Sequence, residues 1–160
     1  MNLVINSEDL SFKNLFFNDS IKNNVMTDSS FIRILYSNNS FMLNGIYIKI
    51  TIVKNNNSLH NIENIYTNNT KIISYIDEIE KYILNKYNNK KLHSYKIKEQ
   101  LQYLIYKITN NQNQNQNQNQ KQKQKQKQNQ NDNILNYILK ISGIWETQTT
   151  IGITNKFISM

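Results

Sequence analysis

Residues 31–53 read FIRILYSNNSFMLNGIYIKITIV and hold the clearest strand pattern in the chain. Phe31–Tyr36 is a run of mostly β-branched and aromatic residues, which strands favour. Ser37–Ser40 consists of Ser and Asn alone and is typical of a turn. Phe41–Val53 continues with a second apolar run. This stretch therefore predicts two strands joined by a turn.

The second of these strands has two different faces. Its isoleucines at positions 46, 48, 50 and 52 alternate with Tyr47, Lys49 and Thr51. Side chains of a strand point alternately to opposite faces of a sheet. We therefore expect the isoleucine face in the core and the polar, aromatic face half exposed, as in an antiparallel sheet with one solvated side. Gly45 within the strand predicts a bulge or a sharp bend.

One long amphipathic helix is predicted over Lys71–Tyr87. Isoleucines recur there at helical spacing and form an apolar stripe, which we expect to cover the sheet. The residues that define the stripe are Ile72, Ile76, Ile79 and Ile83.

Weaker patterns predict the other elements. Leu59–Tyr66 is interpreted as a short strand, Lys96–Gln100 as a short helix and Tyr103–Ile108 as a strand. A long strand is predicted over Ile134–Trp145, with its partner over Ile151–Ile158. One face of the long strand carries Leu135, Tyr137, Leu139, Ile141 and Trp145.

This order of elements indicates a single domain over residues 1–160, of the α+β class, with a mainly antiparallel sheet. Two architectures fit it equally well. One is an OB-like barrel of five strands closed by the helix. The other is an open antiparallel sheet packed on the helix.

Residues 110–131 contain only Asn, Gln and Lys. This tract has no apolar side chains to bury, so it is predicted to be a disordered low-complexity insertion in a hairpin loop between Ile108 and Ile134. Its interpretations are a neutral surface insertion, a polar tether whose lysines contact phosphates, or a segment that self-associates through Asn and Gln, which its four lysines oppose. The chain has a net charge of +8, and without the four lysines of the tract it has +4.

The composition excludes several classes of function. The chain has no Cys, which excludes disulfides, thiolate nucleophiles and Cys-based zinc sites. His60 and His93 lie too far apart in sequence for a local metal-binding motif. The longest apolar run, Phe41–Val53, is shorter than the roughly 20 residues of a membrane helix. We therefore expect a soluble, intracellular, non-catalytic protein without cofactor or metal.

Two groups of residues are candidates for binding nucleic acid. The segment Lys86–Lys98 contains five lysines and two tyrosines but no acid, and the second group lies on the two strands described first. Cations attract polyanions, and tyrosines can stack on unpaired bases. The alternative is that the lysines simply follow a helix C-terminus, where cations are favoured. The candidates are Arg33, Tyr47, Lys49, Lys86, Lys90, Lys91, Tyr95, Lys96 and Lys98.

Several blocks of the sequence resemble known families. KISGIWET at 140–147 and IGITNKFI at 151–158, with FIRILYS at 31–37 and LNGIYI at 43–48, resemble small uncharacterised proteins of giant DNA viruses of the mimivirus type. A Trp followed by a turn and GITNKF is also similar to the last hairpin of phage-type single-stranded-DNA-binding OB domains. Those domains end in an acidic tail, whereas this chain ends KFISM. The resemblance implies a viral protein of the host cytoplasm or the virion.

Two hypotheses of function follow. The first is a non-catalytic accessory protein of viral replication that binds single-stranded DNA or RNA through an OB-like groove. The second is a structural protein that packs against other viral proteins and has no nucleic-acid site. The sequence indicates no oligomeric state.

Overall fold

A computed structural model describes residues 4–6, 9–53, 62–88, 90–116 and 134–160, with the backbone alone described at 62–68 and 109–116. A short 3-10 helix, η2, precedes the first strand. In chain order the elements are η2 (Phe12–Asn14), β1 (Leu15–Lys22), β2 (Ser30–Ser37), β3 (Met42–Asn44), β4 (Ile46–Val53), α1 (Ile62–Tyr87), β5 (Leu92–Ser94), α2 (Ile97–Gln116), β6 (Ile134–Glu146) and β7 (Thr150–Ser159).

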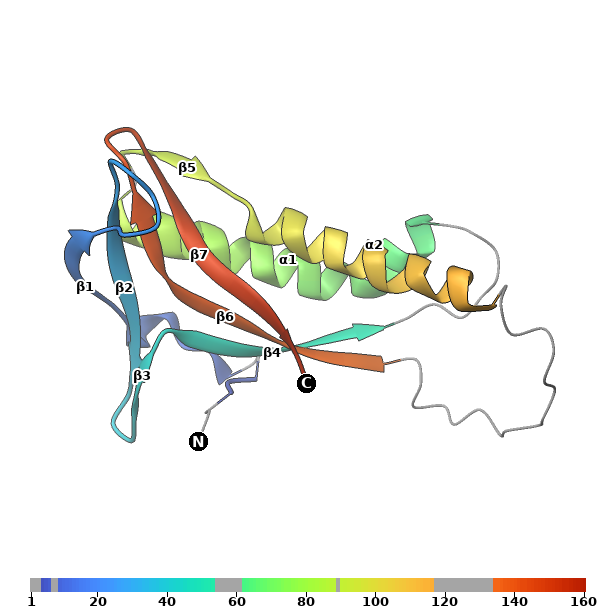
Figure 1. Cartoon of the computed structure of the whole chain (residues 1–160). Helices are drawn as coiled ribbons and strands as arrows, with labels where there is room; N and C mark the ends of the chain where they lie inside the picture. The colour runs from blue at the N-terminus through green and yellow to red at the C-terminus, as the bar shows by residue number, and fades with distance from the viewer. Residues whose placement is uncertain (1–3, 7–8, 54–61, 89, 117–133) are drawn as a thin grey trace.

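The strands form one sheet in the order β1-β2-β6-β7-β5, in which β3 also pairs with β2 and β4 with β6 (Figure 1). Every pair of strands is antiparallel except β5 and β7, which are parallel. Within the described residues β1 and β5 end the sheet and do not pair with each other. The sheet is therefore open, and no closed barrel forms. The fold is of the α+β class, as predicted.

Gly45 is the point at which one continuous stretch of chain changes its partner strand. β3 pairs with β2, whereas β4, directly after Gly45, pairs with β6. Gly45 has a φ of 93°, and a Cβ atom there would lie 2.5 Å from the carbonyl oxygen of Ile141. Only glycine adopts this conformation readily and allows so close an approach. The predicted bend at Gly45 is confirmed.

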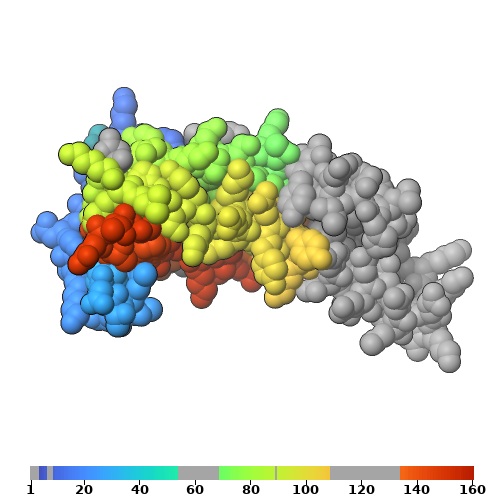
Figure 2. Space-filling view, turned by 90° about the horizontal axis from the view of Figure 1, so that it is seen from above, coloured from blue at the N-terminus to red at the C-terminus, as the bar shows by residue number. Residues whose placement is uncertain are grey.

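Both helices cover the same face of the sheet, which we call the inner face. α1 packs against α2, β4 and β7, and Figure 2, seen from the helix side, shows α1 and α2 across the molecule. The core lies between this layer and the sheet, and the isoleucine face of β4 is fully buried in it, as predicted. Its largest buried side chains include Ile46, Ile48, Ile50, Ile52, Ile76, Ile79, Ile83, Leu84 and Ile97.

A bulge in β6 corrects the predicted face of that strand. The pairing of β6 with β7 shifts between Ile141 and Gly143, so Ser142 is an extra residue. Up to Ile141 the predicted face points inward, but beyond the bulge Ile144 is buried in place of Trp145. Trp145 lies on the outer face, where its ring covers Gly152 of β7.

Three other predictions of secondary structure are wrong. Residues 103–108, predicted as a strand, belong to α2, and residues 62–66 begin α1, whereas 59–61 lie outside the described residues. The Asn/Gln/Lys tract therefore begins within a helix and does not join two hairpin strands. Residues 110–116 of the tract lie within α2, and 117–131 lie outside the described residues.

The start of α2 depends on a carboxylate from α1. Glu80 Oε1 accepts hydrogen bonds from the backbone N–H groups of Lys96 (2.8 Å) and Ile97 (3.1 Å), and Oε2 also accepts from Ile97 at 3.1 Å. The first N–H groups of a helix have no partners within the helix, so the buried Glu80 acts as a cap for α2. Burial raises the pKa of Glu80 above its ordinary value, although these hydrogen bonds act to lower it.

Candidate nucleic-acid interface

The predicted binding residues lie in two separate places. Arg33 on β2 and Tyr47 and Lys49 on β4 alternate with buried residues, so they lie on the outer face of the sheet, away from the helices. The segment Lys86–Lys98 runs from the end of α1 through β5 into α2 and thus belongs to the helix side (Figure 1). The two groups do not form one surface.

Three of the lysines in the segment Lys86–Lys98 contact other elements of the fold. Lys86 Nζ donates to the carbonyl oxygens of Phe12 (3.1 Å) and Leu15 (2.9 Å). Lys98 Nζ lies 3.7 Å from a carboxylate oxygen of Asp77. The third, Lys91, binds Glu146 and is described below. These contacts favour the structural interpretation of the segment over the nucleic-acid one.

The remaining members of the segment are exposed but dispersed. Among the side chains that the structure describes, Lys90 and Lys96 take part in no ion pair. The Tyr95 hydroxyl lies 2.8 Å from Nδ1 of His93, whose Nε2 lies 2.8 Å from the carbonyl oxygen of Asn88. Because a carbonyl only accepts, Nε2 donates the hydrogen bond to Asn88. Both ring nitrogens of His93 are thus engaged in local contacts.

The outer face of β4, β6 and β7 gathers a basic and aromatic surface, which we call the basic face. Two cross-strand rows form it, because residues directly opposite one another in a sheet lie on the same face. The first row is Tyr47, Lys140 and Lys156, and the second is Lys49, Ile138 and Ile158. Lys140 Nζ lies 5.4 Å from the centre of the Tyr47 ring, within cation–π range.

No acidic side chain of the strands that form or adjoin the basic face lies on it. Across β2, β3, β4, β6 and β7, Glu146 is the only acidic residue, and it lies on the inner face. There its carboxylate pairs with Lys91 at 2.9 Å and accepts a hydrogen bond of 2.8 Å from the Tyr87 hydroxyl. Lys91 Nζ also donates to the carbonyl oxygen of Thr147. The basic face therefore has no internal counter-charge among these strands.

The contacts of Glu146 shift two pKa values. Partial burial acts to raise the pKa of Glu146, but the hydrogen bonds from Lys91 and Tyr87, with the charge of Lys91, bring it below its ordinary value. Desolvation, followed by the bond to Glu146, raises the pKa of Tyr87 to about 12. The raised pKa of Tyr87 and the lowered pKa of Glu146 mean that the neutral tyrosine and the ionised carboxylate are favoured, as expected of a structural contact.

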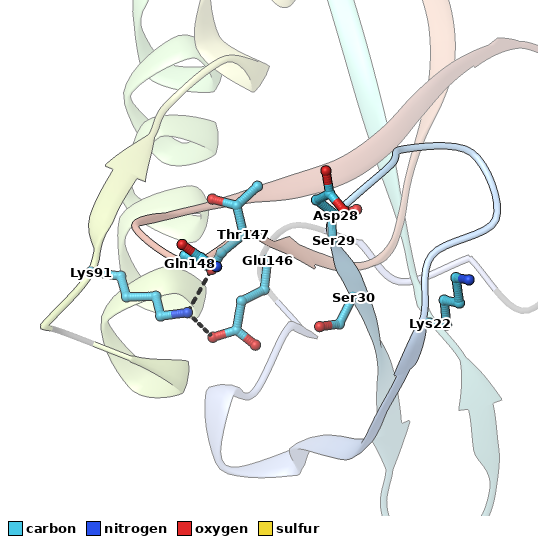
Figure 3. Close-up of a pocket in the computed structure, with 8 residues that line it drawn as sticks. All are labelled: Lys22, Asp28, Ser29, Ser30, Lys91, Glu146, Thr147 and Gln148. Atoms are coloured by element: carbon cyan, nitrogen blue, oxygen red, sulfur yellow. Dashed lines mark hydrogen bonds and ion pairs between the residues drawn. The ribbon is translucent and has the colours of Figure 1, made fainter.

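An open hollow of about 470 Å³ lies beside this ion pair at the end of the sheet (Figure 3). Its walls are mixed in charge, and the ammonium group of Lys91 is directed at Glu146 and not into open space. We assign no ligand to it. The lining residues are Lys22, Asp28, Ser29, Ser30, Lys91, Glu146, Thr147 and Gln148.

The described part of the chain contains neither a metal cluster nor a membrane-spanning helix. No group of three or more His, Asp and Glu side chains that could hold a metal ion occurs there. Neither helix, so far as described, combines the length and apolar character of a membrane span. His60 lies outside the described residues.

Sequence reasoning missed Lys140 and Lys156. Lys140 alternates with the apolar residues of the predicted strand 134–145, so its outward direction could have been read from the sequence. The position of Lys140 beside Lys156 and Tyr47 could not be predicted, because it depends on the register of three strands.

No protein-family model, curated protein or solved structure matches the chain. The resemblances to giant-virus proteins and to phage OB domains therefore remain predictions.

Proposed function

We propose that the chain is a non-catalytic accessory protein, of viral origin as the resemblance implies, that binds single-stranded DNA or RNA on the basic face of its open sheet. An open sheet lacks the groove of an OB barrel, on which the sequence hypothesis relied. The proposed site therefore moves to the outer face of β4, β6 and β7. It keeps Tyr47 and Lys49 of the predicted residues.

The pair Lys140–Lys156 is the main support for this proposal. The two lysines are directly opposite in an antiparallel pair, where like charges repel and destabilise a sheet. No acidic side chain on β4, β6 or β7 offsets them on this face. The negative charge of a bound polyanion would relieve the repulsion between the two lysines. Each phosphate contact would also release counterions, which favours binding.

The other residues of the basic face favour unpaired bases. Tyr47 offers a ring for stacking, which is tolerant of base sequence. Ile138 and Ile158 are half-buried and lie in the row next to Lys140 and Lys156, so they present apolar surface to the flat sides of bases. A duplex exposes its phosphates but not these base faces, and it would gain only the electrostatic part of the interaction.

An oligonucleotide titration by fluorescence anisotropy tests this proposal. We expect Lys140→Glu with Lys156→Glu to weaken binding of a single-stranded oligonucleotide about tenfold or more, and to reduce the salt dependence by about two phosphates. The matched control is Lys90→Glu with Lys96→Glu, which changes the net charge equally but on the helix side. Equal losses in both variants would show non-specific attraction and contradict the proposal.

The lysines of the tract need a separate control. Replacing Lys121, Lys123, Lys125 and Lys127 by Gln keeps the length of the tract and removes its charge. We expect most of the binding to remain. Loss of all binding in this variant would place the interaction in the tract instead of on the sheet.

A further inference from the structure

The outer face has a second surface, over β1 and β2, that differs from the basic face. Ile21 lies opposite Phe31, and Phe16 lies opposite Leu35. Phe16 is 52 % exposed and Ile21 56 % exposed, which is high for such large apolar side chains. We call this surface the β1–β2 stripe.

Two opposite charges lie in the middle of the β1–β2 stripe. The pairing of β1 with β2 shifts between Phe17 and Ser20, which leaves Asn18 and Asp19 opposite Arg33. Asp19 and Arg33 are both exposed. Neither takes part in an ion pair with another described residue.

The β1–β2 stripe is complementary to itself. Each of its three rows joins one residue type on β1 to a fitting type on β2, namely apolar to apolar, acidic to basic, and again apolar to apolar. A twofold axis that runs between β1 and β2, parallel to them, places β1 of one copy over β2 of another. Every row then meets its complement, as an isologous interface requires.

We propose that the β1–β2 stripe is the contact between two copies of this chain, with Arg33 of each copy paired with Asp19 of the partner subunit. Sheets that pack face to face keep their strands nearly aligned, which suits this axis. The apolar rows on either side shield the two ion pairs from water, so these charges set the orientation of the copies.

This arrangement leaves the basic face uncovered. The twofold axis exchanges the two sides of the β1–β2 stripe, so β4, β6 and β7 of the two copies extend in opposite directions from the contact. Arg33, a predicted nucleic-acid residue, is then assigned to the protein contact. The inference does not depend on the proposed nucleic-acid site, and its test uses no nucleic acid.

Sedimentation of the full chain tests the contact through a charge exchange. We expect the original chain to be a dimer at about 100 µM. Arg33→Glu or Asp19→Lys alone should raise the dissociation constant about tenfold or more, because each change puts like charges opposite one another at both of the symmetry-related pairs. The double variant Asp19→Lys with Arg33→Glu should return to within about threefold of the original chain, since it restores both pairs in reverse.

Two measurements make the result decisive. Circular dichroism melting establishes that each variant is folded, and Lys49→Glu serves as the matched control because it adds the same charge to the outer face but outside the stripe. A monomeric original chain, a double variant as weak as the single ones, or a Lys49→Glu variant as weak as Arg33→Glu would each overturn the proposal.

Discussion

The two faces of β4 belong to the same strand, but only the inner face is constrained by packing in the core. The inner face consists of isoleucines that are at most 1 % exposed beneath the helices, while on the outer face Lys49 and Thr51 are exposed. Packing determines the inner face, because a buried side chain must fill its space. The outer face has no such constraint, so it can carry charge at little cost to folding. A protein of this kind can place its binding surface on the same strands that build its core.

The largest expected effect comes from the inner face. Ile50→Ala should lower the free energy of unfolding by about 2–5 kcal/mol, because it removes buried methyl groups and leaves a cavity. Lys49→Ala, one residue away on the outer face, should change it by less than about 0.5 kcal/mol. Urea denaturation of both variants measures the difference, and similar losses would contradict the division of the two faces.

A smaller effect is expected at Glu80, a charged residue within the buried layer. Glu80→Ala leaves the N–H groups of Lys96 and Ile97 without their partner, which should cost about 1–3 kcal/mol of stability. Glu80→Gln keeps an oxygen that can accept and should cost less. A melting study of both variants tests this order, and an equal loss would show that the cap itself contributes little.

The pH dependence of the Glu80→Gln variant gives a further check. Folding raises the pKa of Glu80 above its ordinary value of 4.5. The folded chain therefore holds a proton that the unfolded chain has released, and the stability due to Glu80 is present below pH 4.5 and lost as the pH rises through the raised pKa. The stability of Glu80→Gln relative to the original chain should increase over this range. A constant difference would contradict the raised pKa.

The smallest expected effect is a gain in stability, whereas the substitutions above cause losses. Lys156→Glu replaces a repelling cross-strand pair with an attractive one and should raise stability by about 0.2–1 kcal/mol. The same change should weaken oligonucleotide binding several-fold, because it puts a carboxylate on the basic face. Lys156→Gln should give intermediate values of both. If Lys156→Glu lowered stability, the two lysines would not repel each other in the folded chain.

Local sequence was enough to predict the elements whose pattern repeats over many residues. The alternation in β4 and the isoleucine stripe of α1 each indicate, without reference to the rest of the chain, which face is buried. α2 was misread because its aromatic and β-branched residues favour a strand, whereas Ile97, Leu101 and Ile105 are buried at helical spacing. Its cap comes from Glu80 on another helix, so no local signal marked its start.

The candidate site was predictable only in part for a related reason. The alternation in β4 places Tyr47 and Lys49 on a solvated face, but the neighbours of these residues belong to strands far away in sequence. A shift of register by one residue would turn Lys140 inward. The bulge at Ser142 moves Trp145 to the outer face, and although the adjacent Gly143 is typical of a bulge, the resulting change of face follows only from the pairing with β7.

The position of β6 and β7 in the chain has a consequence for synthesis. These strands follow every other element in sequence, yet β2, β4 and β5 all pair with them. As the chain grows from its N-terminus, the edges by which β2, β4 and β5 pair must wait for these two strands. Exposed edges and apolar surface promote aggregation. The growing chain is thus most in need of protection by chaperones just before its final hairpin is made.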